Sequence, residues 1–211
     1  MWLYNDNHQF QRQTDNSIVY LKSSLHQLSN QIEGRPKAQT GAQNSRHQST
    51  IDSQHDEFCG RWTKREATIF INMHNKVFQQ AMEEGITAWN NTGAFKFKIV
   101  PNRQQADIIA TTSNNSGDQA AGLTEMSVST MSGYFTSSHI YLNKAYLLNP
   151  AYNYSHQRIV NTAEHELGHA IGLSHNNAQS VMQPSGSFFS IQNIDIQSVN
   201  NLYAKKPSKV Q

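Results

Sequence analysis

The eleven residues from His165 to His175 constrain the fold of this chain more than any other part of its sequence, and they read His-Glu-x-x-His-x-x-Gly-x-x-His. Because an α-helix repeats every 3.6 residues, His165 and His169 project from one face of a helix. Gly172 follows three residues later, where a glycine can adopt a positive φ and turn the chain sharply. The spacing therefore predicts a helix that ends near Gly172 and a turn that brings His175 back toward the first two histidines.

Three histidines that converge in this way suit a zinc ion, which neutral imidazole nitrogens bind at about 2.0–2.1 Å. Three protein ligands leave a fourth position open, which is typical of a catalytic zinc site. Glu166 lies about 100° around the helix from His165, so we expect its carboxylate to contact a zinc-bound water rather than the metal. The alternative is three unrelated histidines at a helix end, which the full pattern disfavours. We therefore predict one catalytic zinc held by His165, His169 and His175.

The chain beyond Trp62 predicts an α+β fold with a single core. β-branched and aromatic runs or alternating apolar residues predict strands over residues 68–71, 95–99, 107–112, 122–128 and 139–143. Apolar residues at helical spacing predict helices over residues 75–91, 155–173 and 191–203, the first of which ends at Gly93. In the last helix, Ile194, Val199 and Leu202 are expected to face inward.

The motif resembles that of the metzincin zinc endopeptidases, which also carry a methionine-containing turn after the third histidine. Here Met182, within Ser-Val-Met-Gln-Pro at residues 180–184, resembles that Met-turn residue. Pro184 stands where astacin-like and serralysin-like members carry tyrosine, so the chain resembles the matrixin branch. Weaker similarities at residues 61–64, 106–108 and 195–203 extend the resemblance over about residues 60–204. It implies a mixed five-stranded twisted sheet with two long helices, then the Met-turn and a C-terminal helix.

The resemblance implies a zinc-dependent endopeptidase that hydrolyses peptide bonds of extended protein substrates. Glu166 would act as the general base and deliver the proton to the leaving amine. Gly122, Leu123 and Thr124 would form the upper rim of the cleft and pair with the substrate as an added strand. Pro184 would line the pocket beyond the scissile bond. Two alternatives stay open: a zinc-bearing binding or adhesion module with little turnover, and a hydrolase of cell-wall peptides or another amide.

Sites for calcium or a second, structural zinc are not expected, although many matrixins carry them. From residue 101 to 155 the acidic residues are Asp107, Asp118 and Glu125, and the one histidine is His139. Calcium usually takes six to eight oxygen ligands, and a structural zinc takes four ligands. We therefore predict neither ion and interpret His139 as an ordinary strand-edge residue. Gly186 replaces a frequent matrixin tyrosine, so the wall of the specificity pocket is expected to differ.

The first 58 residues form a polar leader rich in Gln, Asn, Ser and His. Its apolar residues alternate in spacing between three and four, which predicts a short amphipathic helix through Ile18, Leu21, Leu25, Leu28 and Ile32. We favour a helix that packs on the following domain over a stalk or a pro-segment. Residues 34–56 are predicted to be a linker. The predicted division is a leader over 1–58, a protease-like domain over 59–205 and a tail over 206–211.

The composition of the chain excludes several classes of partner and covalent link. The net charge of +2 provides no basic footprint for nucleic acid, and no apolar run is long enough to span a bilayer. The single cysteine, Cys59, excludes an intrachain disulfide, and we interpret it as a free thiol at the domain boundary rather than a zinc-binding switch. No signal peptide is visible at the start of the sequence. By resemblance, we expect an extracellular or cell-surface monomer that acts on protein or peptide substrates.

Overall fold

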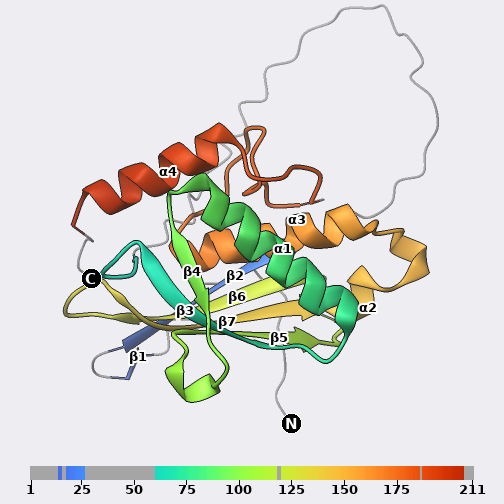
Figure 1. The fold of residues 1–211 in the computed structure, drawn as a ribbon, viewed down its shortest axis with the longest axis horizontal. Coiled ribbons are helices and arrows are strands. Elements are labelled where there is room, and N and C mark those ends of the chain that lie inside the picture. The colour runs from blue at the N-terminus through green and yellow to red at the C-terminus, as the bar shows by residue number, and fades with distance from the viewer. Residues whose placement is uncertain (1–13, 16–17, 27–59, 118–119, 186, 207–211) are drawn as a thin grey trace, which may run out of the picture.

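The computed structural model describes residues 14–15, 18–26, 60–117, 120–185 and 187–206 (Figure 1). The predictions for the linker, for Leu28 and Ile32 of the leader helix, for Cys59, for Gly186 and for residues 207–211 of the tail lie outside these residues. None of the helices in the described part of the chain combines the length and the apolar composition needed to cross a bilayer.

The five predicted strands lie side by side in one mixed sheet, in the order β6-β7-β5-β3-β4, and two strands from the N-terminal segment extend this sheet to seven strands on the β6 side. Parallel ladders join β3 to β4, β3 to β5 and β5 to β7, whereas β6 runs antiparallel to β7. The strands are β3 (Glu66–Asn72), β4 (Lys96–Ile99), β5 (Ile108–Ser113), β6 (Ala120–Ser129) and β7 (Phe135–Asn143). The five predicted strands therefore lie in one sheet. Among these five strands, the antiparallel pair is β6 and β7, and β6 is the strand farthest from β4.

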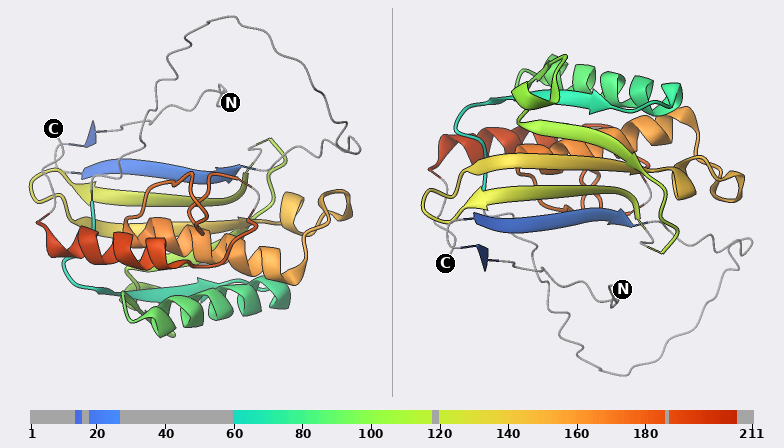
Figure 2. Two further views of the ribbon diagram at one scale, coloured as in Figure 1. Left: turned by 90° about the horizontal axis from the view of Figure 1, so that it is seen from above. Right: turned by 90° about the horizontal axis from the view of Figure 1, so that it is seen from below.

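Two long helices, α1 (Lys76–Thr92) and α3 (His156–Ile171), pack against each other on one face of the sheet, and α3 also packs against β6 and β7 (Figure 2). A short helix, α2 (Lys144–Leu147), follows β7, and 3-10 turns cover Arg103–Gln105 and Pro150–Tyr152. The C-terminal helix is α4 (Asn193–Ala204). The core between the helices and the sheet is built on fully buried side chains such as Phe78, Trp89 and Ile140.

Local sequence explains where the long helices begin and end. The Asn75 side chain accepts a hydrogen bond from the Val77 N–H at the start of α1, and Gly93 ends it with a φ of 69°. Ser155 caps α3 in the same way, and Gly172 ends α3 with a φ of 116°. Polar side chains at an N-cap satisfy backbone N–H groups that have no partner in the helix, and glycine takes a left-handed conformation at low cost. The predicted end of the motif helix at Gly172 is therefore confirmed.

The amphipathic helix predicted over Ile18–Ile32 is wrong where the structure describes this segment. Residues Ile18–His26 form a strand, β2, that pairs antiparallel with β6, and β1 (Thr14–Asp15) pairs with β2. Apolar residues at positions 19, 21 and 25 also fit the two-residue period of a strand. The open edge of β6 decides between the two periods, because strand pairing satisfies backbone groups that would otherwise lack partners.

Two smaller expectations also need correction. In the strand predicted over residues 95–99, the alternation of apolar residues predicts that Ile99 faces the core, but Ile99 is 54% exposed because β4 ends at this residue on the edge of the sheet. His139 was expected at the edge of a strand, but β7 begins at Phe135 and lies between β5 and β6. His139 is therefore in the middle of a central strand, where its ring stacks on that of Tyr141. In α4, Val199 is buried and Ile194 is half-buried.

Candidate metal centre and its carboxylates

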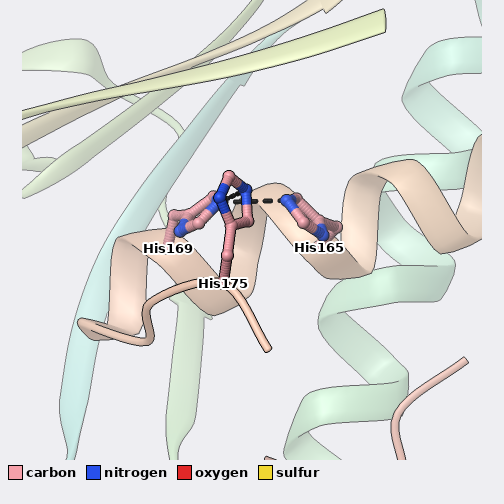
Figure 3. Close-up of side chains that lie close together, drawn as sticks. All are labelled: His165, His169 and His175. Atoms are coloured by element: carbon pink, nitrogen blue, oxygen red, sulfur yellow. Dashed lines mark hydrogen bonds between the residues drawn. The ribbon is translucent and has the colours of Figure 1, made fainter. Parts of the chain in front are cut away.

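The three motif histidines meet at the C-terminal end of α3 (Figure 3). His165 and His169 lie one helical turn apart, and their Nε2 atoms are 2.9 Å from each other. The turn at Gly172 brings His175 back, so that its Nε2 lies 3.3 Å from the Nε2 of His169. One ligand atom from each histidine lies within 4.8 Å of the others, and this group could hold a metal ion. The sequence therefore predicted correctly which histidines come together.

Backbone carbonyls orient two of the rings. His165 Nδ1 donates a hydrogen bond of 2.7 Å to the carbonyl of Val181, and His169 Nδ1 donates one of 2.8 Å to the carbonyl of Leu173. A carbonyl only accepts, so in the neutral rings the protons reside on Nδ1 and the lone pairs on Nε2. The lone pairs of both rings therefore point toward the point at which the three histidines converge.

Burial keeps these rings neutral. Burial, with the nearby His175 as a smaller cause, lowers the pKa of His165 to about 3. Burial also lowers the pKa of His169 well below its usual value, and His165 and His175 contribute in the same direction. Two nitrogens bound to a tetrahedral zinc at about 2.0–2.1 Å would lie about 3.3 Å apart. The chemistry of the three histidines and the separations of their nitrogens therefore fit zinc.

Glu166 is fully buried, and its side chain lies against β6. Thr124 Oγ1 donates a hydrogen bond of 2.6 Å to Glu166 Oε2 and one of 3.1 Å to the Glu166 carbonyl. A Cβ added to Gly122 would lie 2.7 Å from Glu166 Cγ and 2.8 Å from Cδ. Thr124 thus orients the carboxylate, and Gly122 leaves the space it occupies. The sequence predicts Gly122 and Thr124 only as part of a substrate-binding rim, not as neighbours of Glu166. Leu123, the third residue of that rim, is half-buried.

Met182 lies beneath α3, where it is 1% exposed. A Cβ on Gly168, the residue before His169, would overlap Met182 Sδ. The Met182 carbonyl accepts a hydrogen bond of 2.8 Å from the N–H of Asn176, directly after His175. Met182 therefore supports the helix between the first two histidines, while Pro184 is half-buried two residues further along.

Asp195 at the start of α4 holds the segment that orients His165. The Asp195 carboxylate accepts hydrogen bonds from the Ser180 hydroxyl, from the Val181 N–H at 3.0 Å and from the Gln192 N–H at 2.8 Å. Because the carbonyl of Val181 accepts from His165, a chain of hydrogen bonds joins α4 to the metal centre. The bond from the Gln192 N–H belongs to the capping box at the start of α4. Nothing local in the sequence indicated that the same carboxylate reaches Ser180 and Val181.

We predict that Asp195→Ala weakens both the fold and the metal centre. The substitution removes the acceptor of three hydrogen bonds, two of them from backbone N–H groups, of which that of Val181 is buried. The free energy of unfolding should fall by about 3 kcal/mol, measured by urea denaturation. Zinc affinity, measured by competition with a chromophoric chelator, should fall by about 10–100-fold. Asp195→Asn keeps one acceptor oxygen, so its free energy of unfolding and its zinc affinity should lie between those of the parent and of Asp195→Ala. Unchanged zinc affinity in the alanine variant would contradict the positioning role.

Glu164 is a third buried carboxyl group near the metal centre, after Glu166 and Asp195, and it is 4% exposed. Burial is the main cause that raises its pKa to about 7, and the charge of Asp195 adds to it. The N–H of Ile191 donates a hydrogen bond of 3.1 Å to Glu164 Oε2 and opposes the shift. Glu164 therefore anchors the segment before α4, on the other side of α3 from the carboxylate of Glu166 that faces β6.

Comparison with known proteins identifies the family of this chain. The family model described as Matrixin matches residues 61–204. A structure of myroilysin is 13% identical, with a TM-score of 0.43, and the match covers 69% of this chain and 83% of that chain. Archaemetzincin from Methanopyrus kandleri is 13% identical, with a TM-score of 0.44, and the match covers 68% of this chain and 98% of that chain. No curated protein matches the chain. Because the family match includes α3, all three histidines and α4, the chain belongs to the matrixin family of zinc metallopeptidases.

Proposed function

We propose that this protein is a zinc-dependent endopeptidase that hydrolyses peptide bonds in extended segments of protein substrates. The observation that carries the proposal is the convergence of three histidine nitrogens, with separations of 2.9 and 3.3 Å, at the end of α3. His165, His169 and His175 would hold the zinc. When bound, zinc supplies a Lewis acid that polarises a carbonyl oxygen and acidifies water.

Glu166 would act as the general base in this proposal. Its carboxylate would accept a proton from the attacking water and later deliver it to the nitrogen of the departing amine. Thr124 supports this role because its hydroxyl donates to Oε2 and holds one carboxylate oxygen in place. Burial excludes bulk water from the group, which favours directed proton transfer. Met182 would serve as the Met-turn residue that supports the helix beneath the zinc without binding it.

The backbone of β6 around Gly122, Leu123 and Thr124 would bind the substrate as an added antiparallel strand, through the N–H and C=O groups on the side of β6 that pairs with β2 in the structure. Pro184 would line the pocket that receives the side chain after the scissile bond. We propose one catalytic zinc without calcium or structural zinc, in a monomer. Matrixins typically act outside the cell, and we propose the same location for this protein.

Removal and return of the metal tests this proposal. Casein or a peptide library should be cleaved by the zinc-loaded protein, cleavage should stop when a chelator removes the zinc, and it should resume after one equivalent of zinc is added. Mass spectrometry of the products identifies the bonds. Stoichiometric zinc binding without hydrolysis across the library would favour the binding-module alternative. Cleavage confined to cell-wall peptides or other amides would change the substrate class and keep the chemistry.

A further inference from the structure

The edge of β6 that we propose for substrate binding is covered by another part of the same chain. β2 pairs antiparallel with β6 over the whole of Ile18–His26, so that β6 is an interior strand of a seven-stranded sheet. Figure 2 shows β2 beside β6 along its length, on the side away from β7. β2 thus takes the hydrogen-bonding edge that an added peptide strand would need.

The register of this pairing brings β2 past the buried carboxylate. Leu25 pairs with Gly122, Ser24 with Leu123 and Ser23 with Thr124. Gly122 and Thr124 of β6 both lie against the Glu166 side chain. β2 also packs against α3, the helix that carries His165, Glu166 and His169. The backbone of residues 23–25 therefore lies at the part of β6 next to the candidate catalytic groups.

We propose, on the basis of the function proposed above, that β2 is an intramolecular occupant of the substrate-binding edge of β6. An extended substrate and β2 cannot pair with the same edge of β6 at once, so substrate binds only after β2 leaves. Because β2 belongs to the same chain, it competes at a fixed effective concentration that a dilute peptide does not match. The pairing needs no thiol on the metal, so this restraint is independent of Cys59.

Proline substitutions in the full chain test the occupancy of this edge. Adjacent residues of a strand direct their N–H groups to opposite sides, so positions 21 and 24 include one N–H that faces β6. The double variant Leu21→Pro/Ser24→Pro therefore removes at least one hydrogen bond to β6 and should release β2. Ala42→Pro/Ser45→Pro makes the same kind of change elsewhere in the leader and serves as the matched control. Thermal unfolding confirms that each variant keeps its folded domain.

The first measurement does not depend on catalysis. Each double variant is made in a Glu166→Ala background, loaded with zinc and titrated with a fluorescent peptide of sequence IVYLKSSLH, which is β2 itself. We expect the peptide to bind the Leu21→Pro/Ser24→Pro protein at least tenfold more tightly than it binds the control or the parent. Equal affinity for all three proteins would overturn the proposal, because the edge would then be equally open in each.

The second measurement separates this proposal from the proposed function. With Glu166 restored and the intact mass of each sample verified, Leu21→Pro/Ser24→Pro should cleave casein with a kcat/KM at least fivefold above those of the control and the parent. Equal cleavage rates would overturn the occupant role. If no variant cleaves any substrate while the peptide still distinguishes the proteins, the endopeptidase function is contradicted and the occupancy of β6 stands.

Discussion

Replacing Glu166 by alanine should lower kcat/KM by about 10²–10⁴-fold while the protein still binds one equivalent of zinc. The carboxylate is not among the three converging ligands, so the metal centre does not depend on it. Its loss removes the group that would accept the proton of the attacking water, and general-base catalysis usually contributes a factor of this size. Peptide cleavage measures the effect, and elemental analysis of the dialysed protein measures the zinc.

Two further variants isolate the basicity of this carboxylate. Glu166→Gln keeps an oxygen that can accept the hydrogen bond from Thr124, but an amide is not a base. Its kcat/KM should therefore fall by the same factor as that of Glu166→Ala. Glu83→Ala, on the exposed side of α1, removes a carboxylate away from the metal centre and should leave kcat/KM unchanged. Cleavage at the parental rate by Glu166→Ala would rule out the general-base role. Loss of zinc would show instead that Glu166 supports the metal centre.

The metal centre was largely predictable because its geometry is local in sequence. The four-residue spacing of His165 and His169 and the left-handed position at Gly172 depend on helix geometry alone, and the structure confirms that His175 returns to the other two. The five core strands were also recognisable, because alternating or β-branched runs respond to the local pattern of burial. These features need no knowledge of which distant segments pack together.

Features that depend on distant segments were not predictable in this way. The apolar residues of Ile18–His26 fit both a helix period and a strand period, and the open edge of β6, about a hundred residues later in the chain, decides between them. The Asp195 carboxylate accepts hydrogen bonds from the Ser180 hydroxyl and the Val181 N–H, which lie 15 and 14 residues earlier in the chain. The place of Glu166 against β6 likewise follows from tertiary packing, which no spacing within the motif reveals.

Gly122→Ala should reduce kcat by about a hundredfold with little effect on stability. Gly122 lies within strand β6, and a Cβ there would come within 2.8 Å of the Cγ and Cδ atoms of Glu166. The obstructing group is the end of a flexible side chain, so the fold can accept the methyl group by moving the carboxylate. A displacement of about 1 Å in a catalytic group can cost about 10²-fold in rate. Peptide cleavage and thermal unfolding, measured on the same samples, separate the two effects.

The matched control is Gly117→Ala, in the loop before β6, where the nearest atom to an added Cβ is Asn115 Oδ1 at 3.3 Å. That variant should retain parental kcat and zinc content. Parental kcat in Gly122→Ala would show that the carboxylate works equally well after displacement, which would weaken the link between β6 and proton transfer. A large loss of stability with lost zinc would mean instead that Gly122 is needed for the packing of α3 on β6. Reduced kcat with zinc and stability retained is the result expected if the missing side chain at Gly122 sets the position of the base.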